Sequence, residues 1–117
     1  MKLDAILNTI SVPLEVGDLE FRLTPFPNAR VAAWNRATNP DVPDDATNAQ
    51  LVELTEKVQA AQLDILAGHM RDCLTAGEGK KVTAKWVGNT FPQTVLHELA
   101  TFFASGDKPS WVVESGN

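Results

Sequence analysis

The sequence predicts an α+β fold that is mainly α, with an N-terminal β-hairpin packed on a small helical bundle around a long central helix. Two short runs near the N-terminus alternate apolar and charged residues, which is the period of a strand. The later chain repeats apolar residues at intervals of three and four, as helices do. At 117 residues the chain has the size of one domain, which we expect to span residues 1–106, followed by a flexible tail over 107–117.

The first elements are a short helical segment and a hairpin. Apolar residues at helical spacing predict that residues 1–10 form a helix or dock as one, and Pro13 ends it. Residues 14–16 and 19–23 alternate around a Gly-Asp pair, which predicts a β-hairpin at about 12–24. Two strands alone are marginally stable, so their apolar face must lie on helices.

A rigid step and a second helix follow the hairpin. Pro25-Phe26-Pro27 is expected to be extended, and Asn28 to cap a helix over 29–37 with Val31 and Trp34 facing inward. Residues 39–45 contain two prolines and three aspartates, a composition that predicts a mobile loop.

The central helix is predicted over about 47–76. Thr47 and Gln50 have the spacing of a capping box, and Gly77 is expected to end the helix in a left-handed conformation. Its apolar residues form two lines with a polar seam between them, and two lines predict neighbours on two sides. The first line is Leu51, Leu54, Val58, Ala61 and Ile65; the second is Leu63, Leu66, Met70, Cys73 and Leu74; the seam is Thr55, Gln62 and His69.

Two more helices are predicted after a turn at 77–81. Thr83 is expected to cap a short one that carries Trp86 and ends near 88–89. Thr90 and Gln93 have the spacing of a second capping box, for a helix over about 91–105 that ends at Gly106. Its apolar face is Phe91, Val95, Leu96, Leu99, Phe102 and Phe103, with His97 and Thr101 opposite.

Composition and charge exclude several classes of function. The net charge of −5 without a Lys/Arg cluster argues against a nucleic-acid partner. The single cysteine, Cys73, excludes an intrachain disulfide and a cysteine-based zinc site, and its place on an apolar line predicts a core residue. No apolar run is long enough to span a bilayer and residues 1–10 lack a secretory signal, so we expect a soluble intracellular protein with no membrane partner.

No residue pattern predicts catalysis, a cofactor or a metal. Residues 77–81 resemble a phosphate-binding loop only superficially, because Leu74 stands where its first glycine is needed and Lys81 where Ser or Thr is needed. His69 and His97 lie on different helices without partners at ligand spacing. We interpret His69 as a hydrogen-bonded residue at a helix junction, and keep as an alternative a small enzyme or ligand-binding domain that uses it.

Elimination leaves binding to another protein as the function. The residues that we expect to contact a partner are Trp111, Val112 and Val113 in the tail, because a Trp with no core to join is a frequent anchor. Phe26 and Trp86 are secondary candidates. The polar seam of the central helix is a further candidate. For the seam and for Phe26, packing in the core is the preferred alternative, since most apolar groups near a helix are simply buried.

Several pieces of the chain together resemble one family. They are the hairpin Leu-Glu-Val-Gly-Asp-Leu-Glu-Phe-Arg-Leu at 14–23, the Pro-Phe step into a helix, the acidic loop with prolines, and a late module that runs Val-Thr-Ala-Lys-Trp-Val at 82–87, then Phe91-Pro92, Leu96, Leu99, Phe103 and Gly106. As a pattern of elements and spacings over about 12–106, this layout resembles the tail assembly chaperones of long-tailed, siphovirus-type bacteriophages.

The resemblance implies a small non-enzymatic protein of the host cytoplasm. Such proteins bind the tape measure protein, a very long and aggregation-prone helical chain, and help to recruit tail tube protein; a homo-oligomer is left open. Many members also exist in a longer form made by ribosomal frameshift, and the codons of Ser115-Gly116-Asn117 can read xxG GGA AAC, which contains a slippery heptamer. The alternative is a structural virion component, such as a head–tail connector or a tail-completion subunit.

Overall fold

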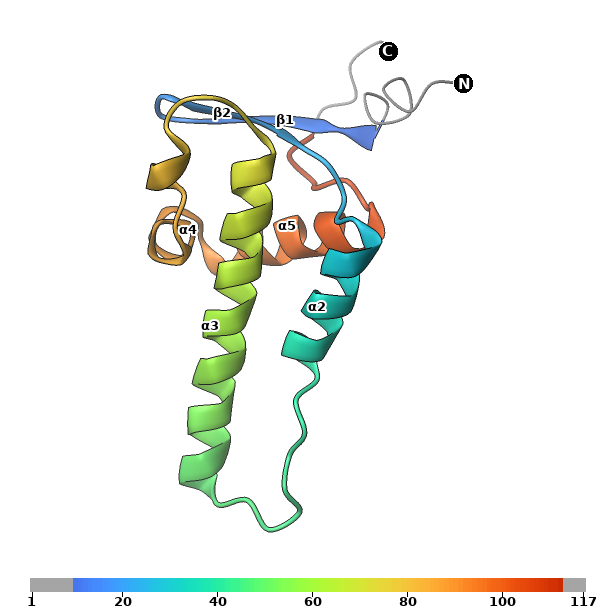
Figure 1. Cartoon of the computed structure of the whole chain (residues 1–117), viewed down its shortest axis with the longest axis vertical. Helices are drawn as coiled ribbons and strands as arrows, with labels where there is room; N and C mark the ends of the chain where they lie inside the picture. The colour runs from blue at the N-terminus through green and yellow to red at the C-terminus, as the bar shows by residue number, and fades with distance from the viewer. Residues whose placement is uncertain (1–9, 113–117) are drawn as a thin grey trace.

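A small antiparallel sheet covers one end of a group of helices, as Figure 1 shows. The computed structural model describes residues 10–112, so most of the helical segment expected over 1–10 lies outside the described residues. The elements are β1 (Val12–Val16), β2 (Leu19–Leu23), α2 (Asn28–Thr38), α3 (Asn48–Asp72), β3 (Leu74–Ala76), the 3-10 turn η1 (Gly79–Lys81), α4 (Ala84–Thr90) and α5 (Gln93–Ser105). The predicted class, α+β and mainly helical with an N-terminal hairpin and a long central helix, is confirmed.

The sheet has one strand more than the sequence predicts. The hairpin pairs Val12 with Leu23 and Val16 with Leu19, and β3 then pairs antiparallel with the other edge of β2. The central helix was therefore predicted too long: α3 ends at Asp72, and the chain continues as a strand. The open edge of β2 explains this early end, because its backbone groups need partners; Arg22 N–H donates to the Cys73 carbonyl at 2.8 Å.

Helix ends follow the predicted caps in part. Thr47 and Gln50 form the capping box, with hydrogen bonds of 2.8 and 3.2 Å, and Gly106 ends α5 in the left-handed conformation. Thr83 caps α4 by accepting from the Trp86 N–H at 3.1 Å. The expected cap at Asn28 is wrong, since Pro27 occupies the N-cap position of α2 and makes no side-chain bond.

The second expected capping box is also wrong. Thr90 is the last residue of α4, and Pro92 is the N-cap of α5, so the Thr90 hydroxyl does not stand at the start of a helix. A short helix thus ends where the sequence pattern predicts that the next one begins.

The core lies between the sheet, α4, α5 and the C-terminal half of α3. Its largest fully buried side chains are Leu19, Leu23, Met70, Leu99, Phe102 and Phe103. The prediction that α3 has neighbours on two sides holds only for this half, where Leu66, Ala67 and Met70 are buried. In the N-terminal half Leu51 is 40% exposed and Val52 is 59% exposed.

The exposed half of α3 belongs to a projecting arm. Residues 39–57, the loop after α2 and the first turns of α3, extend beyond α2 and α5 and away from the sheet (Figure 1). We call these residues the arm. Within residues 10–112, no helix has both the length and the apolar character that a membrane crossing requires.

Gly77 provides a test of the sheet. It makes the turn after β3 at a φ of +104°, and a Cβ there would stand 2.5 Å from Leu19 Cδ2. We predict that Gly77→Ala lowers the free energy of unfolding by about 2 kcal/mol or more, through left-handed strain and this clash. Gly79→Ala is the matched control, because its Cβ would meet only Leu74 Cδ2 at 3.8 Å, and its effect should stay within about 0.5 kcal/mol. Urea denaturation measures both, and equal effects would contradict the turn described here.

Candidate functional site

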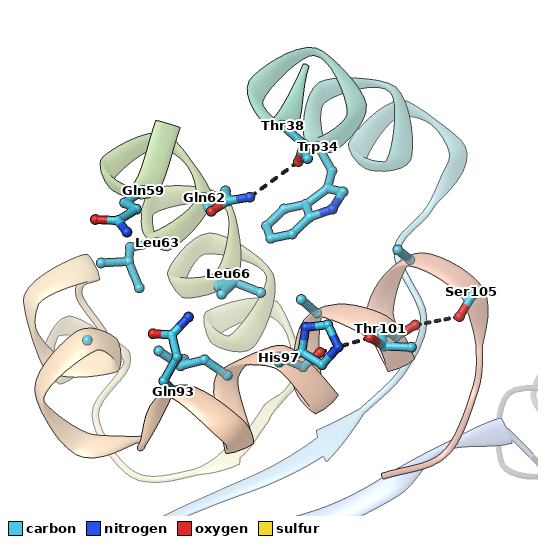
Figure 2. A pocket seen from close by; sticks show the side chains of 14 residues that line it. Trp34, Thr38, Gln59, Gln62, Leu63, Leu66, Gln93, His97, Thr101 and Ser105 are labelled. Carbon is cyan, nitrogen blue, oxygen red and sulfur yellow. Dashed lines mark hydrogen bonds between the residues drawn. The ribbon is translucent and has the colours of Figure 1, made fainter. Parts of the chain in front are cut away.

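An open groove lies where α2, α3 and α5 meet, close to α4. Its volume is about 630 Å³. Figure 2 shows Trp34 of α2, Leu63 and Leu66 of α3, and the polar side chains Gln93 and His97 of α5 around it. Among the described residues that line the groove, His97 is the one titratable side chain, so the lining is apolar with a nearly neutral polar rim.

Small residues on the helices leave this groove open. The bulky side chains of α5, Leu99, Phe102 and Phe103, are buried in the core, while Ala100 and Ala104 face the groove at a spacing of one helical turn. From α4, Gly88 lines the groove without a side chain, and a Cβ there would stand 3.2 Å from Leu63 Cδ1. The helices can therefore be held by the core without closing over this space.

Hydrogen bonds on the rim of the groove join α2 to α3 and run along α5. Gln62 Nε2 donates to Thr38 Oγ1 at 3.4 Å and so links α3 to α2. The Thr101 hydroxyl donates to the His97 carbonyl at 2.9 Å, and the Ser105 hydroxyl donates to the Thr101 carbonyl at 2.6 Å (Figure 2). The Ser105 hydroxyl also lies 3.2 Å from Asp107 Oδ2, just beyond the end of α5. The groove can bury an apolar side chain and offer amide groups at its margin.

His69, the alternative site from the sequence, lies in the core and outside this groove. Its Nε2 lies 2.6 Å from the Thr24 carbonyl oxygen, and its Nδ1 lies 2.8 Å from Arg30 Nη1. A carbonyl only accepts and a guanidinium only donates, so the ring carries its proton on Nε2 and is neutral. Burial lowers the pKa of His69, with the nearby Arg30 charge acting in the same direction. Arg30 in turn pairs with Asp72 at 2.8 Å.

Cys73 lies beside His69, in an arrangement that superficially resembles a thiol nucleophile and its base. The Sγ is 3.7 Å from Nε2. Burial raises the pKa of the Cys73 thiol, which keeps it protonated, and the Nε2 proton is already given to Thr24. The rings of Phe26 and Phe103 pack edge-on against His69, with centroids 4.7 and 4.6 Å away. The cluster fits the interpretation of His69 as a junction residue.

None of the predicted contact residues that the structure describes lines the groove. Phe26 is 6% exposed and packs on His69, Phe103 and Trp34, so its prediction as a partner contact is corrected: the Pro-Phe-Pro step turns the ring into the core. Trp86 is half-buried and packs on Phe21 and Phe91.

The described part of the expected tail packs against the domain. Pro109 is buried, and Trp111 and Val112 are half-buried on the core. The Ser110 N–H donates to Glu98 Oε1 at 3.1 Å, which ties the segment to α5. The expectation of a free tail is therefore corrected for residues 107–112, because Trp111 does have a core to join. Val113 lies outside the described residues.

The sequence predicts the groove as a site only through Gln62, which belongs to the polar seam named as a candidate. Two features of the sequence coincide with the groove. Gln62 of the polar seam lines it, and so do His97 and Thr101 on the polar side of α5. Within residues 10–112 no three His, Cys, Asp or Glu side chains are placed to hold a metal ion. Comparisons of the chain with known protein families, with curated proteins and with solved structures found no match.

The neutral state of His69 leads to a pH prediction. An unfolded histidine takes up a proton below a pH of about 6.5, whereas the lowered pKa of His69 keeps the native ring neutral. The native state then binds fewer protons, so the free energy of unfolding should fall as the pH drops from 7 through this range. His69→Gln keeps a donor and an acceptor but removes the titration, and should flatten this part of the profile.

Denaturant unfolding at several pH values above 5 measures the effect. His97→Gln removes an exposed imidazole instead, and should keep the pH dependence that His69 causes. A His69→Gln profile parallel to that of the unchanged protein would contradict the neutral, buried imidazole.

Proposed function

We propose that this protein is a non-enzymatic tail assembly chaperone that binds the tape measure protein of a long-tailed bacteriophage and promotes tail tube assembly. The observation that carries the proposal is the open groove between α2, α3 and α5. Apolar grooves between helices commonly receive the apolar face of a partner helix, and the tape measure protein of such phages is a long helical chain.

The layout of the chain supports the same proposal. The hairpin, the Pro-Phe step into α2, the acidic loop and the module from Val82 to Gly106 stand in the order that the resemblance describes. The net charge of −5 suits the task, because repulsion between like-charged complexes keeps an aggregation-prone client dispersed. In this proposal the protein acts in the host cytoplasm, where it holds the tape measure chain until tail tube subunits arrive.

The proposal involves contacts and no reaction. The two side chains best suited to chemistry, His69 and Cys73, are both buried, and their polar groups take part in hydrogen bonds within the core. The His69–Thr24 bond joins α3 to the residue that follows β2, and the Arg30–His69 bond joins α2 to α3. This supports a binding role better than a catalytic one.

Co-expression with the tape measure protein of the same genome tests the proposal. We predict that affinity capture of this chain recovers the tape measure protein, and that the soluble fraction of the tape measure protein rises when both are made together. Failure to recover it, with both proteins soluble, would contradict the proposal. A tail tube protein included in the same experiment tests the recruitment step.

Two further observations separate the proposal from a structural role in the virion. Mass spectrometry should find that purified phage particles lack this protein. Its presence in stoichiometric amounts would instead indicate a connector or tail-completion subunit. The nucleotide sequence around the codons of residues 115–117 should contain a slippery heptamer followed by an open overlapping frame.

A further inference from the structure

The arm combines exposed apolar side chains with nearly all of the net charge of the chain. Residues 39–57 hold five carboxylates and one lysine, a net charge of −4, whereas the whole chain carries −5. Among the described residues, four large hydrophobic side chains count as exposed, and three of them, Val42, Leu51 and Val52, lie in the arm. The arm thus has exposed apolar surface and a strongly negative charge, while the rest of the chain has a net charge of only −1.

A second groove joins the arm to the groove between α2, α3 and α5. It has a volume of about 430 Å³ and is lined from the arm by Val42, Leu51 and Leu54. Thr38, Gln59 and Gln62 line both grooves, so the two are adjacent, and the hydrogen bond from Gln62 to Thr38 links α3 to α2 where they meet. We call them together the track. Along α3 the track runs from Leu51 to Leu66, which at 1.5 Å per residue is roughly 22 Å, or about four helical turns.

We propose that the track binds a single amphipathic helix of another protein, about four turns long, with Lys or Arg beside its apolar face. The length of the track and its apolar lining fit one face of such a helix. Its charged end sets the sign of the partner: Asp41, Asp44 and Asp45 lie in the same loop as Pro40 and Val42, which line the groove at that end. Basic side chains on the incoming helix meet these carboxylates.

The same charges argue against a second copy of this chain as the occupant. Two copies that paired through their tracks side by side and parallel would bring two arms of charge −4 together, and an antiparallel pair would leave each arm without a basic partner, because the α5 end of the groove has no Lys or Arg in its lining. The proposed function determines only one part of this inference, namely that the helix comes from the tape measure protein. The surface and the chemistry of the partner follow from the arm and the grooves.

Synthetic peptides test the inference without the tape measure protein. The probe is a labelled 16-residue helix with Leu along one face and Lys elsewhere, and its binding is followed by fluorescence anisotropy. One control peptide has the same composition in an order that removes the apolar face, and another carries Glu in place of Lys. We predict that the Leu-Lys helix binds the full chain at least tenfold tighter than either control, with an affinity that falls as salt is added.

Adjacent substitutions on α3 locate the binding surface. Gln59 and Ala60 are both exposed, but Gln59 lines both grooves whereas Ala60 lines neither. Gln59→Arg should weaken binding of the Leu-Lys helix at least tenfold, and Ala60→Arg, which adds the same side chain on another face, should leave it unchanged. Replacing Asp41, Asp44 and Asp45 by Asn should weaken binding and reduce its dependence on salt.

Three results would overturn the inference. They are equal binding of the ordered and reordered Leu-Lys peptides, equal effects of Gln59→Arg and Ala60→Arg, and a dimer in solution that Gln59→Arg converts to a monomer. The proposed function fails separately. If the peptide binds as predicted but the tape measure protein is not captured, only the proposed function is wrong; if Gln59→Arg captures it as well as the unchanged chain does, only the track is wrong.

Discussion

The packing of Phe26 against His69 and Phe103 is the contact on which the arrangement of the helices depends. It joins the end of the hairpin to α3 and α5. The centroid of the Phe26 ring lies 4.7 Å from that of His69 and 5.3 Å from that of Phe103. The Phe26 N–H also donates to the Phe103 carbonyl at 2.7 Å. Burial of such a ring contributes roughly 1.5–3 kcal/mol. The contact decides where α2 begins, and therefore that α2 runs beside α3 and borders the groove.

This junction secures only the C-terminal half of α3. The sheet, α4 and α5 cover that half, and the arm continues past them (Figure 1). In the arm, the side chains of Leu51 and Val52 are exposed. Exposed apolar groups on a single chain usually favour self-association, and the net charge of −4 on the arm opposes it. The arm therefore has both exposed apolar side chains and negative charge, which a surface that binds a basic, amphipathic partner requires.

Elements that depend on interactions between residues close in the sequence are predicted well. The hairpin follows from alternation around Gly17, and the caps at Thr47, Thr83 and Gly106 follow from side chains within one turn of their targets. The sequence misses what distant partners decide. The three residues of β3 form a strand because β2 has an open edge, and the apolar lines of α3 cannot reveal that Leu51 and Val52 remain exposed among residues 10–112.

The candidate site was less predictable than the fold. Bulky and aromatic residues attract attention in a sequence, yet Phe26 is in the core and Trp111 packs on it. The groove instead arises where small residues of separate helices meet, such as Gly88 and Ala100. The small size of these residues becomes informative only in the folded structure, because no spacing within one helix encodes the distance to another.

Amide hydrogen exchange on the complex recovered from co-expression tests the central claim most directly. In the free protein, amides of the arm should exchange faster than those of residues 63–72, which lie in the core half of α3. Complex formation should protect the arm and the groove side of α5 while leaving the sheet unchanged. Protection confined to the sheet, with an arm that exchanges as fast as before, would contradict the account.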